Sequence, residues 1–208
     1  MAGVARIQRE DIINTAFEIV KEKGMEGLNA RDIAKKLNCS IQPIFYQFFN
    51  MDELKQVVVE KIHEIYKEYM LSGVNSDAAY KAMGNSYVRF ARDYPEFFKI
   101  MFMQKAEMNA DNYAEIDYLG DEIIKTGQKF TGLSFEEQKE FHLKVWFFTH
   151  GIATLIVTGT IKLTDEEIDK LLETTVRQML KGYKIEKGEK RWLRLKILVK
   201  FITMKKRQ

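Results

Sequence analysis

The sequence predicts an all-α protein, in which an N-terminal three-helix helix-turn-helix unit is joined by a long helix to a C-terminal helical bundle. Three observations predict this fold class. Apolar residues recur every three or four positions along most of the chain, as they do on one face of a helix. Side chains that cap helices precede many of these apolar runs. The 208 residues include only two prolines, which argues against a turn-rich β protein.

The first two helices are predicted from their boundaries. An apolar face within residues 12–20 predicts a helix that ends at Gly24. Asn29 and Asp32 have the spacing of an N-cap and the acidic third residue of a capping box. They predict a second, short helix that continues to Leu37.

The turn after the second helix predicts a helix-turn-helix arrangement. Only Asn38 and Cys39 separate this helix from a very short third one, for which we expect Ser40 as the N-cap. So short a connection sets two helices at a steep angle, and Asn tolerates the positive φ that such a turn commonly needs. Ile44 and Phe48, four positions apart, are expected to face the core. The outward face then consists of Ile41, Gln42, Phe45, Tyr46 and Gln47.

Six further helices are predicted along the rest of the chain. Their expected starts lie at or near Asp52, Ser76, Pro95, Asp111, Ser134 and Thr164. The helix that starts at Asp52 connects the N-terminal unit to a larger bundle, and no flexible linker separates the two parts. We therefore expect a helix-turn-helix domain over residues 1–54, a helical bundle over residues 55–185 and a basic, amphipathic extension over residues 186–208.

Charge is distributed unevenly along the chain. Residues 184–208 contain ten Lys and Arg against two Glu, a net charge of +8, whereas the remaining residues carry a net charge of −5. In the extension Trp192, Leu195, Val199 and Ile202 form one apolar stripe. The extension therefore suits a dimer interface, a membrane surface or nonspecific contact with DNA, and we favour packing on its own or the partner subunit.

Catalytic and metal-binding patterns are missing from the sequence. A single cysteine excludes an intramolecular disulfide, and the three histidines, His63, His142 and His150, do not have metal-ligand spacing. There is no pairing of nucleophile and base and no glycine-rich phosphate loop. We predict no enzyme activity, no catalytic residue, no metal and no cofactor. Residues 145–161 are uncharged but short and rich in Thr, so no transmembrane segment is predicted. A cytoplasmic location is expected.

Three segments between about residue 8 and residue 55 carry a family resemblance. They read REDIINTAFEIVKEKG, NARDIAKKLNCS and FYQFFNMDEL. In order and spacing they resemble the DNA-binding region of TetR/AcrR-type transcriptional repressors. The resemblance implies a homodimeric, ligand-responsive repressor that binds a palindromic double-stranded DNA operator. It also implies that the residues contacting DNA are among Asn29, Arg31, Ser40, Ile41, Gln42, Pro43, Phe45, Tyr46, Gln47 and Lys55.

The candidates on the third helix differ in the contact they are expected to make. Gln42 and Gln47 suit the hydrogen-bonding edges of bases, while Ile41 and Pro43 suit thymine methyl groups. The chain also departs from the family pattern. Phe45 stands where the family usually has a Tyr that contacts a phosphate, and Met51, Asn38 and Asn29 replace a Lys, a turn Gly and a Thr. Fewer phosphate contacts predict DNA binding that is weaker and less salt-dependent.

The C-terminal half supplies the other expectations of the resemblance. Trp146 to Gly151, WFFTHG, resembles the Trp-His-Gly signature of one C-terminal subgroup of these regulators. The density of aromatic and Met residues suits a small apolar or aromatic effector. The expected pocket residues are Tyr87, Phe90, Phe98, Met101, Phe102, Tyr113, Trp146 and His150. His150 also fits the reading of a hydrogen-bonded core histidine.

The family's last two long helices pair with those of a second subunit. The resemblance therefore implies a dimer interface that includes Gly151, Thr154, Leu155, Thr158, Leu171, Thr175 and Gln178. The alternative hypothesis is a helical small-molecule or membrane-surface binding protein whose DNA affinity is weakened, because Phe45 and Met51 cannot make the usual phosphate contacts. The sequence names neither the effector nor the operator.

Overall fold

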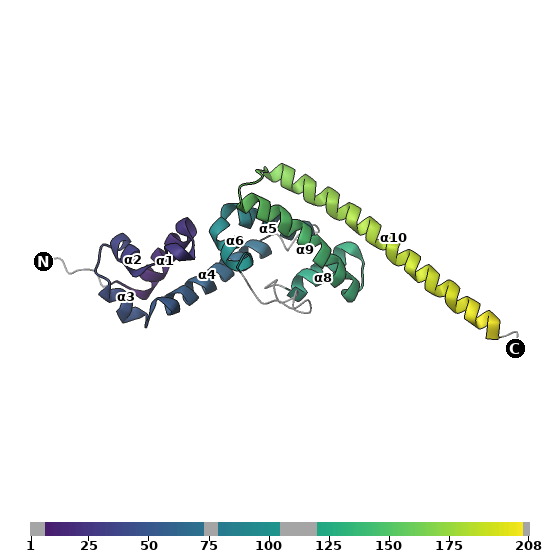
Figure 1. Ribbon diagram of the computed structural model, residues 1–208, viewed down its shortest axis with the longest axis horizontal. Helices are drawn as coiled ribbons and strands as arrows, with labels where there is room; N and C mark the ends of the chain where they lie inside the picture. The colour runs from purple at the N-terminus through teal and green to yellow at the C-terminus, as the bar shows by residue number, and fades with distance from the viewer. Residues whose placement is uncertain (1–6, 73–78, 105–119, 206–208) are drawn as a thin grey trace.

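The computed structural model describes residues 7–72, 79–104 and 120–205, and within these ranges the regular structure is entirely helical, as predicted. The helix-turn-helix unit lies at one end, the bundle follows, and the last helix projects at the other end (Figure 1). In chain order the elements are α1 (Arg9–Lys23), the 3-10 helix η1 (Met25–Gly27), α2 (Ala30–Lys36), α3 (Gln42–Gln47), α4 (Met51–Leu71), α5 (Ala79–Asp93), α6 (Pro95–Phe102), α8 (Gly120–Thr131), α9 (Phe135–Val157) and α10 (Asp165–Lys205).

Local signals shape the helix-turn-helix unit. The Asn29 side chain accepts the Asp32 backbone N–H at 2.9 Å and caps α2 as expected. Asn38 has a φ of 50°, so the turn after α2 uses the left-handed conformation that the sequence predicted. The prediction for Ser40 was wrong, because the N-cap of α3 is Ile41 and no side chain caps that helix. Pro43 supplies the start instead, since its fixed φ fits the first turn.

The connecting helix α4 begins one residue before the expected start at Asp52. Asn50 is its N-cap and accepts the Glu53 backbone N–H at 2.9 Å. The sequence did not predict Asn50 as a cap, because this residue directly follows the aromatic residues Phe48 and Phe49. The 21-residue helix buries one side chain on each successive turn, and these are Leu54, Val58, Ile62, Tyr66 and Met70.

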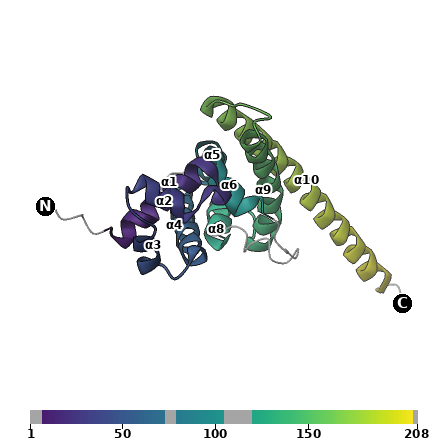
Figure 2. The same ribbon diagram turned by 60° about the vertical axis from the view of Figure 1, so that its left-hand side comes forward.

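The helix-turn-helix unit is joined to the bundle through α1 as well as through α4. The rings of Phe17 on α1 and Phe97 on α6 are 4.8 Å apart between centroids, and Phe97 is fully buried. Lys61 Nζ on α4 donates to Asn14 Oδ1 on α1 at 2.6 Å. Figure 2 shows α1 beside both α4 and α6. Because two helices hold α1, its orientation is linked to the packing of the bundle.

In the bundle, α5 is the central helix. It packs against α4, α6, α8, α9 and α10. Its side chains Val88, Phe90 and Ala91 are fully buried. Capping boxes open the two longest helices as predicted: Ser134 and Glu137 bond reciprocally at the start of α9, and Thr164 and Glu167 do so before α10.

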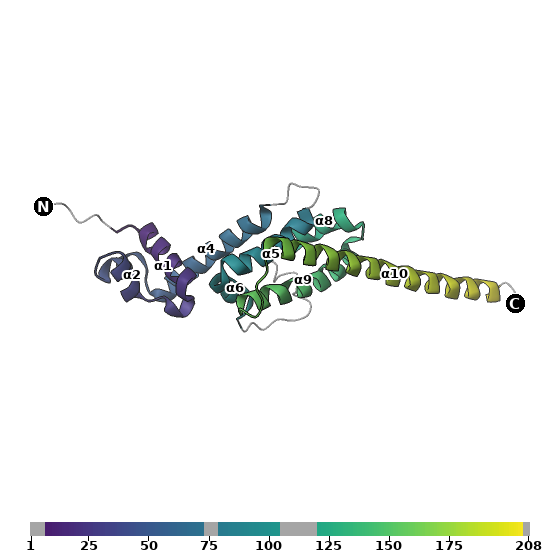
Figure 3. The same ribbon diagram turned by 90° about the horizontal axis from the view of Figure 1, so that it is seen from above.

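The last helix α10 is a single helix of 41 residues. It continues through the boundary that we placed at residue 186. Its first part packs on α5 and α9, and its C-terminal part extends past the bundle in Figure 1 and Figure 3. In the part of the chain that the structure describes, no helix is long and apolar enough to cross a membrane.

Candidate DNA-binding face and effector pocket

The aromatic run around α3 divides between core and surface. Ile44 is fully buried and Phe48 is 2% exposed, as predicted, whereas Phe45 is 45% and Tyr46 is 82% exposed. Ile41 and Gln42 are also exposed, and Pro43 and Gln47 are half-buried. The short helix α3 therefore presents apolar, aromatic and amide groups together on one accessible face.

Phe49 extends this face and was not among the predicted DNA-binding residues. Its side chain is 90% exposed, and its backbone N–H donates to Glu53 Oε2 at 2.6 Å. Glu53 also forms an ion pair with Arg9, whose guanidinium lies 4.4 Å from the centre of the Phe48 ring. The start of α4 is thus fixed beside α3. The sequence contained one indication that Phe49 would be exposed, namely that it directly follows Phe48, which was predicted to face the core.

The remaining DNA-binding candidates have different surroundings. Arg31 and Ser40 are exposed. The Asn29 side chain is engaged in the local backbone, because its amide donates to Gly27 O at 3.2 Å while its oxygen caps α2. Lys55 pairs with Asp52 at 3.1 Å, so its charge is partly compensated before any phosphate approaches.

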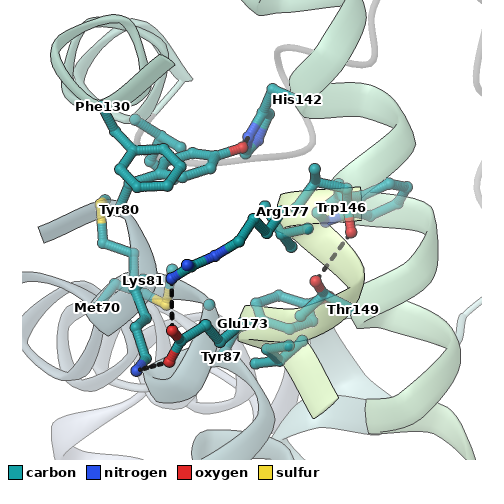
Figure 4. A pocket seen from close by; sticks show the side chains of 16 residues that line it. Met70, Tyr80, Lys81, Tyr87, Phe130, His142, Trp146, Thr149, Glu173 and Arg177 are labelled. Atoms are coloured by element: carbon teal, nitrogen blue, oxygen red, sulfur yellow. Dashed lines mark hydrogen bonds and ion pairs between the residues drawn. The ribbon is translucent and has the colours of Figure 1, made fainter. Parts of the chain in front are cut away.

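A cavity of about 280 Å³ opens within the bundle. Its walls come from α4, α5, α8, α9 and α10 (Figure 4). It is lined by Met70, Tyr80, Lys81, Met83, Gly84, Tyr87, Ile123, Phe130, His142, Val145, Trp146, Thr149, Leu172, Glu173, Val176 and Arg177. This mixture of apolar walls and few polar groups is typical of small-molecule sites.

One side of the cavity is aromatic. The rings of Tyr80 and Phe130 are stacked with centroids 6.0 Å apart, and Figure 4 shows both facing the cavity with His142 beside them. Tyr80 Oη lies 3.0 Å from His142 Nδ1. These three residues belong to α5, α8 and α9, so this wall depends on the packing of three helices.

The opposite side carries charge. Glu173 Oε2 is 2.6 Å from Lys81 Nζ, and Glu173 Oε1 is 2.6 Å from Arg177 Nη2. Lys81 also pairs with Asp169 at 2.9 Å. The hydrogen bond from Lys81 lowers the pKa of Glu173, and the same bond raises the pKa of Lys81. Glu173 and Lys81 are therefore both charged at neutral pH.

The predicted pocket residues only partly coincide with this lining. Tyr87 and Trp146 line the cavity, but Phe90, Phe98, Met101, Phe102 and His150 do not. Phe90 and Phe98 are fully buried. Tyr113 lies outside the described residues. The segment rich in aromatic residues forms the core around α6, whereas the cavity lies toward α8 and α10.

His150 lies behind the cavity wall among aromatic rings. Its ring stacks on Trp146 and Phe98, with centroids 5.0 Å and 5.5 Å away, and its Nδ1 is 2.8 Å from Tyr87 Oη. Burial lowers the pKa of His150. These contacts are those of a core histidine in its neutral form.

The residues predicted for a dimer interface lie on α9 and α10. Gly151 is exposed, and a methyl group built there would meet nothing within 4 Å. Leu155 and Leu171 are exposed large apolar side chains, and Gln178 is exposed. Thr154 and Thr175 are half-buried, and Thr158 donates to Thr154 O at 2.9 Å.

In this structure a helix-turn-helix unit and a helical bundle that contains a cavity belong to one polypeptide. This architecture is typical of transcriptional regulators that combine DNA binding and ligand binding in the same chain. Comparisons with known proteins agree. The family model described as "Tetracyclin repressor-like, C-terminal domain" matches residues 80–179. The tetracycline repressor class D of Escherichia coli is 24% identical over 202 residues, which cover 91% of this chain and 86% of that protein. The biofilm operon icaADBC negative transcriptional regulator IcaR of Staphylococcus epidermidis is 22% identical over 125 residues, 56% of this chain and 68% of that protein.

Solved structures show the same fold. A TetR-like transcriptional regulator from Rhodococcus sp. RHA1 aligns with a TM-score of 0.62 at 14% identity, covering 86% of this chain and 99% of the other. A TetR-family regulator from Mesorhizobium loti aligns with a TM-score of 0.54 at 14% identity, covering 84% and 95%. The chain is therefore similar to TetR-type transcriptional regulators in the sequence of its bundle and in its fold. Membership of the Trp-His-Gly subgroup stays a prediction.

Proposed function

We propose that the protein is a homodimeric repressor that binds a palindromic DNA operator and releases it when a small molecule enters the bundle cavity. The observation that carries this proposal is the division of the α3 side chains. Ile44 and Phe48 hold the helix in the core, while Gln42, Phe45 and Tyr46 remain accessible. A recognition helix needs this arrangement because it enters the major groove.

The proposed reading of bases relies on α3. Gln42 supplies the hydrogen-bonding amide, which suits adenine, and Ile41 offers an apolar contact to a thymine methyl group. Phe45, Tyr46 and Phe49 contribute contact area rather than charge. From this composition we expect the protein to recognise its operator through DNA shape and apolar contacts.

The proposed dimer uses the outer faces of α9 and α10. Leu171, Gln178 and Ile185 recur at intervals of seven on α10, and all three are exposed. A glycine inside an exposed helix costs roughly 1 kcal/mol relative to alanine, and Gly151 and Gly182 are both such residues with open space beside them. Close approach of a partner helix accounts for small residues at these positions. Two recognition helices would then meet half-sites about one helical turn apart.

The proposed route from the cavity to DNA passes through α6. Tyr87 lines the cavity and its ring lies 5.6 Å from that of Phe98 on α6. On the same helix Phe97 packs against Phe17 of α1. A ligand that changes the position of Tyr87 would therefore change that of α1 and of the recognition helix attached to it. Differential binding of the ligand to the two arrangements supplies the coupling.

Fluorescence anisotropy with the DNA upstream of the protein's own gene tests the proposal. The wild-type protein is expected to bind at low salt. Gln42→Ala should weaken binding by roughly tenfold, as expected for loss of an amide contact to a base, whereas the exposed Gln104→Ala, distant from α3 in the chain, should not. An absence of binding at low salt would contradict the repressor proposal and favour the alternative of a binding protein with weakened DNA affinity.

Sedimentation tests the dimer separately. Gly151→Leu places a large side chain on the proposed interface and should produce a monomer. Lys139→Leu is the control, because Lys139 is also exposed on α9, about three turns before Gly151, and is not part of the proposed interface. Equal sedimentation of the Gly151→Leu variant and the wild-type protein as dimers would refute this interface.

A further inference from the structure

We propose that the cavity binds a small molecule with a flat apolar or aromatic body and one carboxylate, and that Arg177 holds the carboxylate. This inference rests on the proposed function, because it assigns a chemical class to the effector of the same cavity. Three features of the lining carry it: the apolar walls, the ion pairs that already occupy both oxygens of Glu173, and the exposure of Arg177 relative to Lys81.

The walls favour a flat apolar body. Aliphatic and Met side chains from five helices line the cavity, namely Met70, Met83, Ile123, Val145, Leu172 and Val176. The stacked pair of Tyr80 and Phe130 and the ring of Trp146 supply flat surfaces. Aromatic ligands gain both apolar burial and offset stacking on such surfaces. A volume of about 280 Å³ limits the ligand to the small end of the range for such sites.

The charges favour an anionic group. Among the lining residues, Lys81 and Arg177 supply the basic groups and Glu173 supplies the carboxylate. Each Glu173 oxygen already has a cation, Lys81 on one and Arg177 on the other. Lys81 is in addition paired with Asp169 outside the lining, so the two cations and two carboxylates of this cluster balance. A cationic ligand would have to displace a cation from Glu173, whereas an anionic ligand can use the guanidinium donors of Arg177 that Glu173 does not occupy.

Arg177 is better placed than Lys81 to receive the carboxylate. Lys81 is bound by two carboxylates, since Asp169 pairs with it at 2.9 Å and is itself fixed by Asn85 at 2.7 Å. The Arg177 side chain is 75% exposed, compared with 33% for Lys81. In Figure 4 the Arg177 side chain extends between Glu173 and the Tyr80–Phe130 pair.

The geometry of the guanidinium completes the argument. Only Nη2 takes part in the bond to Glu173. A guanidinium presents five N–H donors in a plane, so the other nitrogens of the same side chain can donate to a second carboxylate. With the carboxylate at Arg177, the body of the ligand reaches the aromatic wall formed by Tyr80 and Phe130.

Isothermal titration calorimetry with three probes of one shape tests this inference. The probes are 2-naphthoate, 2-naphthylmethanol and 2-naphthylmethylammonium, which differ in charge. The wild-type protein is expected to bind naphthoate most tightly and the ammonium compound least. Arg177→Gln should weaken naphthoate binding roughly tenfold or more, as expected for loss of a charged hydrogen bond, and leave binding of the alcohol unchanged. Glu173→Gln should strengthen naphthoate binding, because it removes a competing carboxylate.

Lys181→Gln is the matched control. Lys181 is exposed one turn further along α10 and does not line the cavity, so this substitution changes the net charge equally without altering the site. Circular dichroism confirms that each variant is folded. The inference is overturned if the alcohol or the ammonium compound binds as tightly as naphthoate, if Arg177→Gln and Lys181→Gln have equal effects, or if none of the three probes binds. DNA binding measured without probe distinguishes the causes, because it is retained when only this inference fails and lost when the proposed function fails.

Discussion

Phe17 on α1 and Phe97 on α6 pack ring against ring, with centroids 4.8 Å apart and planes tilted by 51°. Phe97 also stacks on Tyr94 at 5.4 Å, and Tyr94 lies 5.6 Å from Phe90 in the bundle core. One continuous aromatic cluster therefore supports both the helix-turn-helix unit and the bundle. The orientation of the recognition helix depends on this cluster as well as on α4.

Replacing Phe97 with Leu tests this dependence. We expect a loss of about 1–1.5 kcal/mol in the free energy of unfolding, measured in urea, because an aliphatic side chain of similar size fills the site imperfectly. Affinity for operator DNA should also fall, since α1 is less firmly held. Phe141→Leu is the control, because Phe141 is fully buried but packs against Tyr183. If both variants lose the same stability and the same DNA affinity, the Phe17–Phe97 contact has no special role.

Phe48 and Phe49 are adjacent in the chain and should respond oppositely to replacement by Ala. Phe48→Ala should cost about 3–5 kcal/mol of stability, as for other buried Phe residues. Phe49→Ala should change stability by no more than about 0.5 kcal/mol, because its side chain is 90% exposed, but should weaken DNA binding. Urea unfolding and DNA anisotropy measured on both variants check this. Unchanged DNA affinity in Phe49→Ala would remove Phe49 from the proposed interface.

The two departures from the family pattern predict separable gains. Met51→Lys at the start of α4 should steepen the dependence of log K on log salt by about 1.8 for the dimer, as expected for one more phosphate contact in each of two subunits. Phe45→Tyr adds a hydroxyl donor and should strengthen DNA binding without a comparable change in slope. Anisotropy titrations across a salt series measure both. An unchanged slope in Met51→Lys would show that the N-terminus of α4 does not approach a phosphate.

Stability should decrease as the pH falls through the ordinary histidine range. Burial lowers the pKa of His150 and of His63 below the ordinary value of 6.5. Between the folded and ordinary values, only the unfolded chain takes up the proton, so stability present above pH 6.5 is lost as the pH falls. His150→Gln should therefore lose less stability than the wild-type protein between about pH 7.5 and about pH 5.5, measured by urea unfolding. An equal loss in both proteins would exclude His150 as a contributor.

The sequence predicted the helix-turn-helix unit well because its determinants are local. Asn29 caps the helix that directly follows it, and Asn38 adopts the left-handed conformation within the turn itself. The four-residue spacing of Ile44 and Phe48 identified the buried side of a helix from its period. The N-cap of α3 was missed because Ser40 has the right residue type for a cap, but the helix begins two residues later, after Ile41.

The cavity could not be predicted in the same way. Tyr80, Phe130 and Arg177 come from three helices that are far apart in the chain, and only the packing of the bundle brings them together. The density of aromatic and Met residues, together with the family resemblance, placed the pocket among residues of α5, α6 and α9, of which Tyr87 and Trp146 line the cavity. Phe98 on α6 instead fills the core against Tyr87 and His150. A local pattern reports which residues are apolar, but it does not report which of them leave space between helices.

Selection of binding sites from random double-stranded DNA tests the central claim most directly. The wild-type protein is expected to enrich an inverted repeat whose half-sites lie about one helical turn apart, and Gln42→Ala should lose or alter the preferred base at one position in each half-site. Enrichment of no sequence, or the same repeat with both proteins, would contradict the assignment of α3 as the recognition helix of a dimeric repressor.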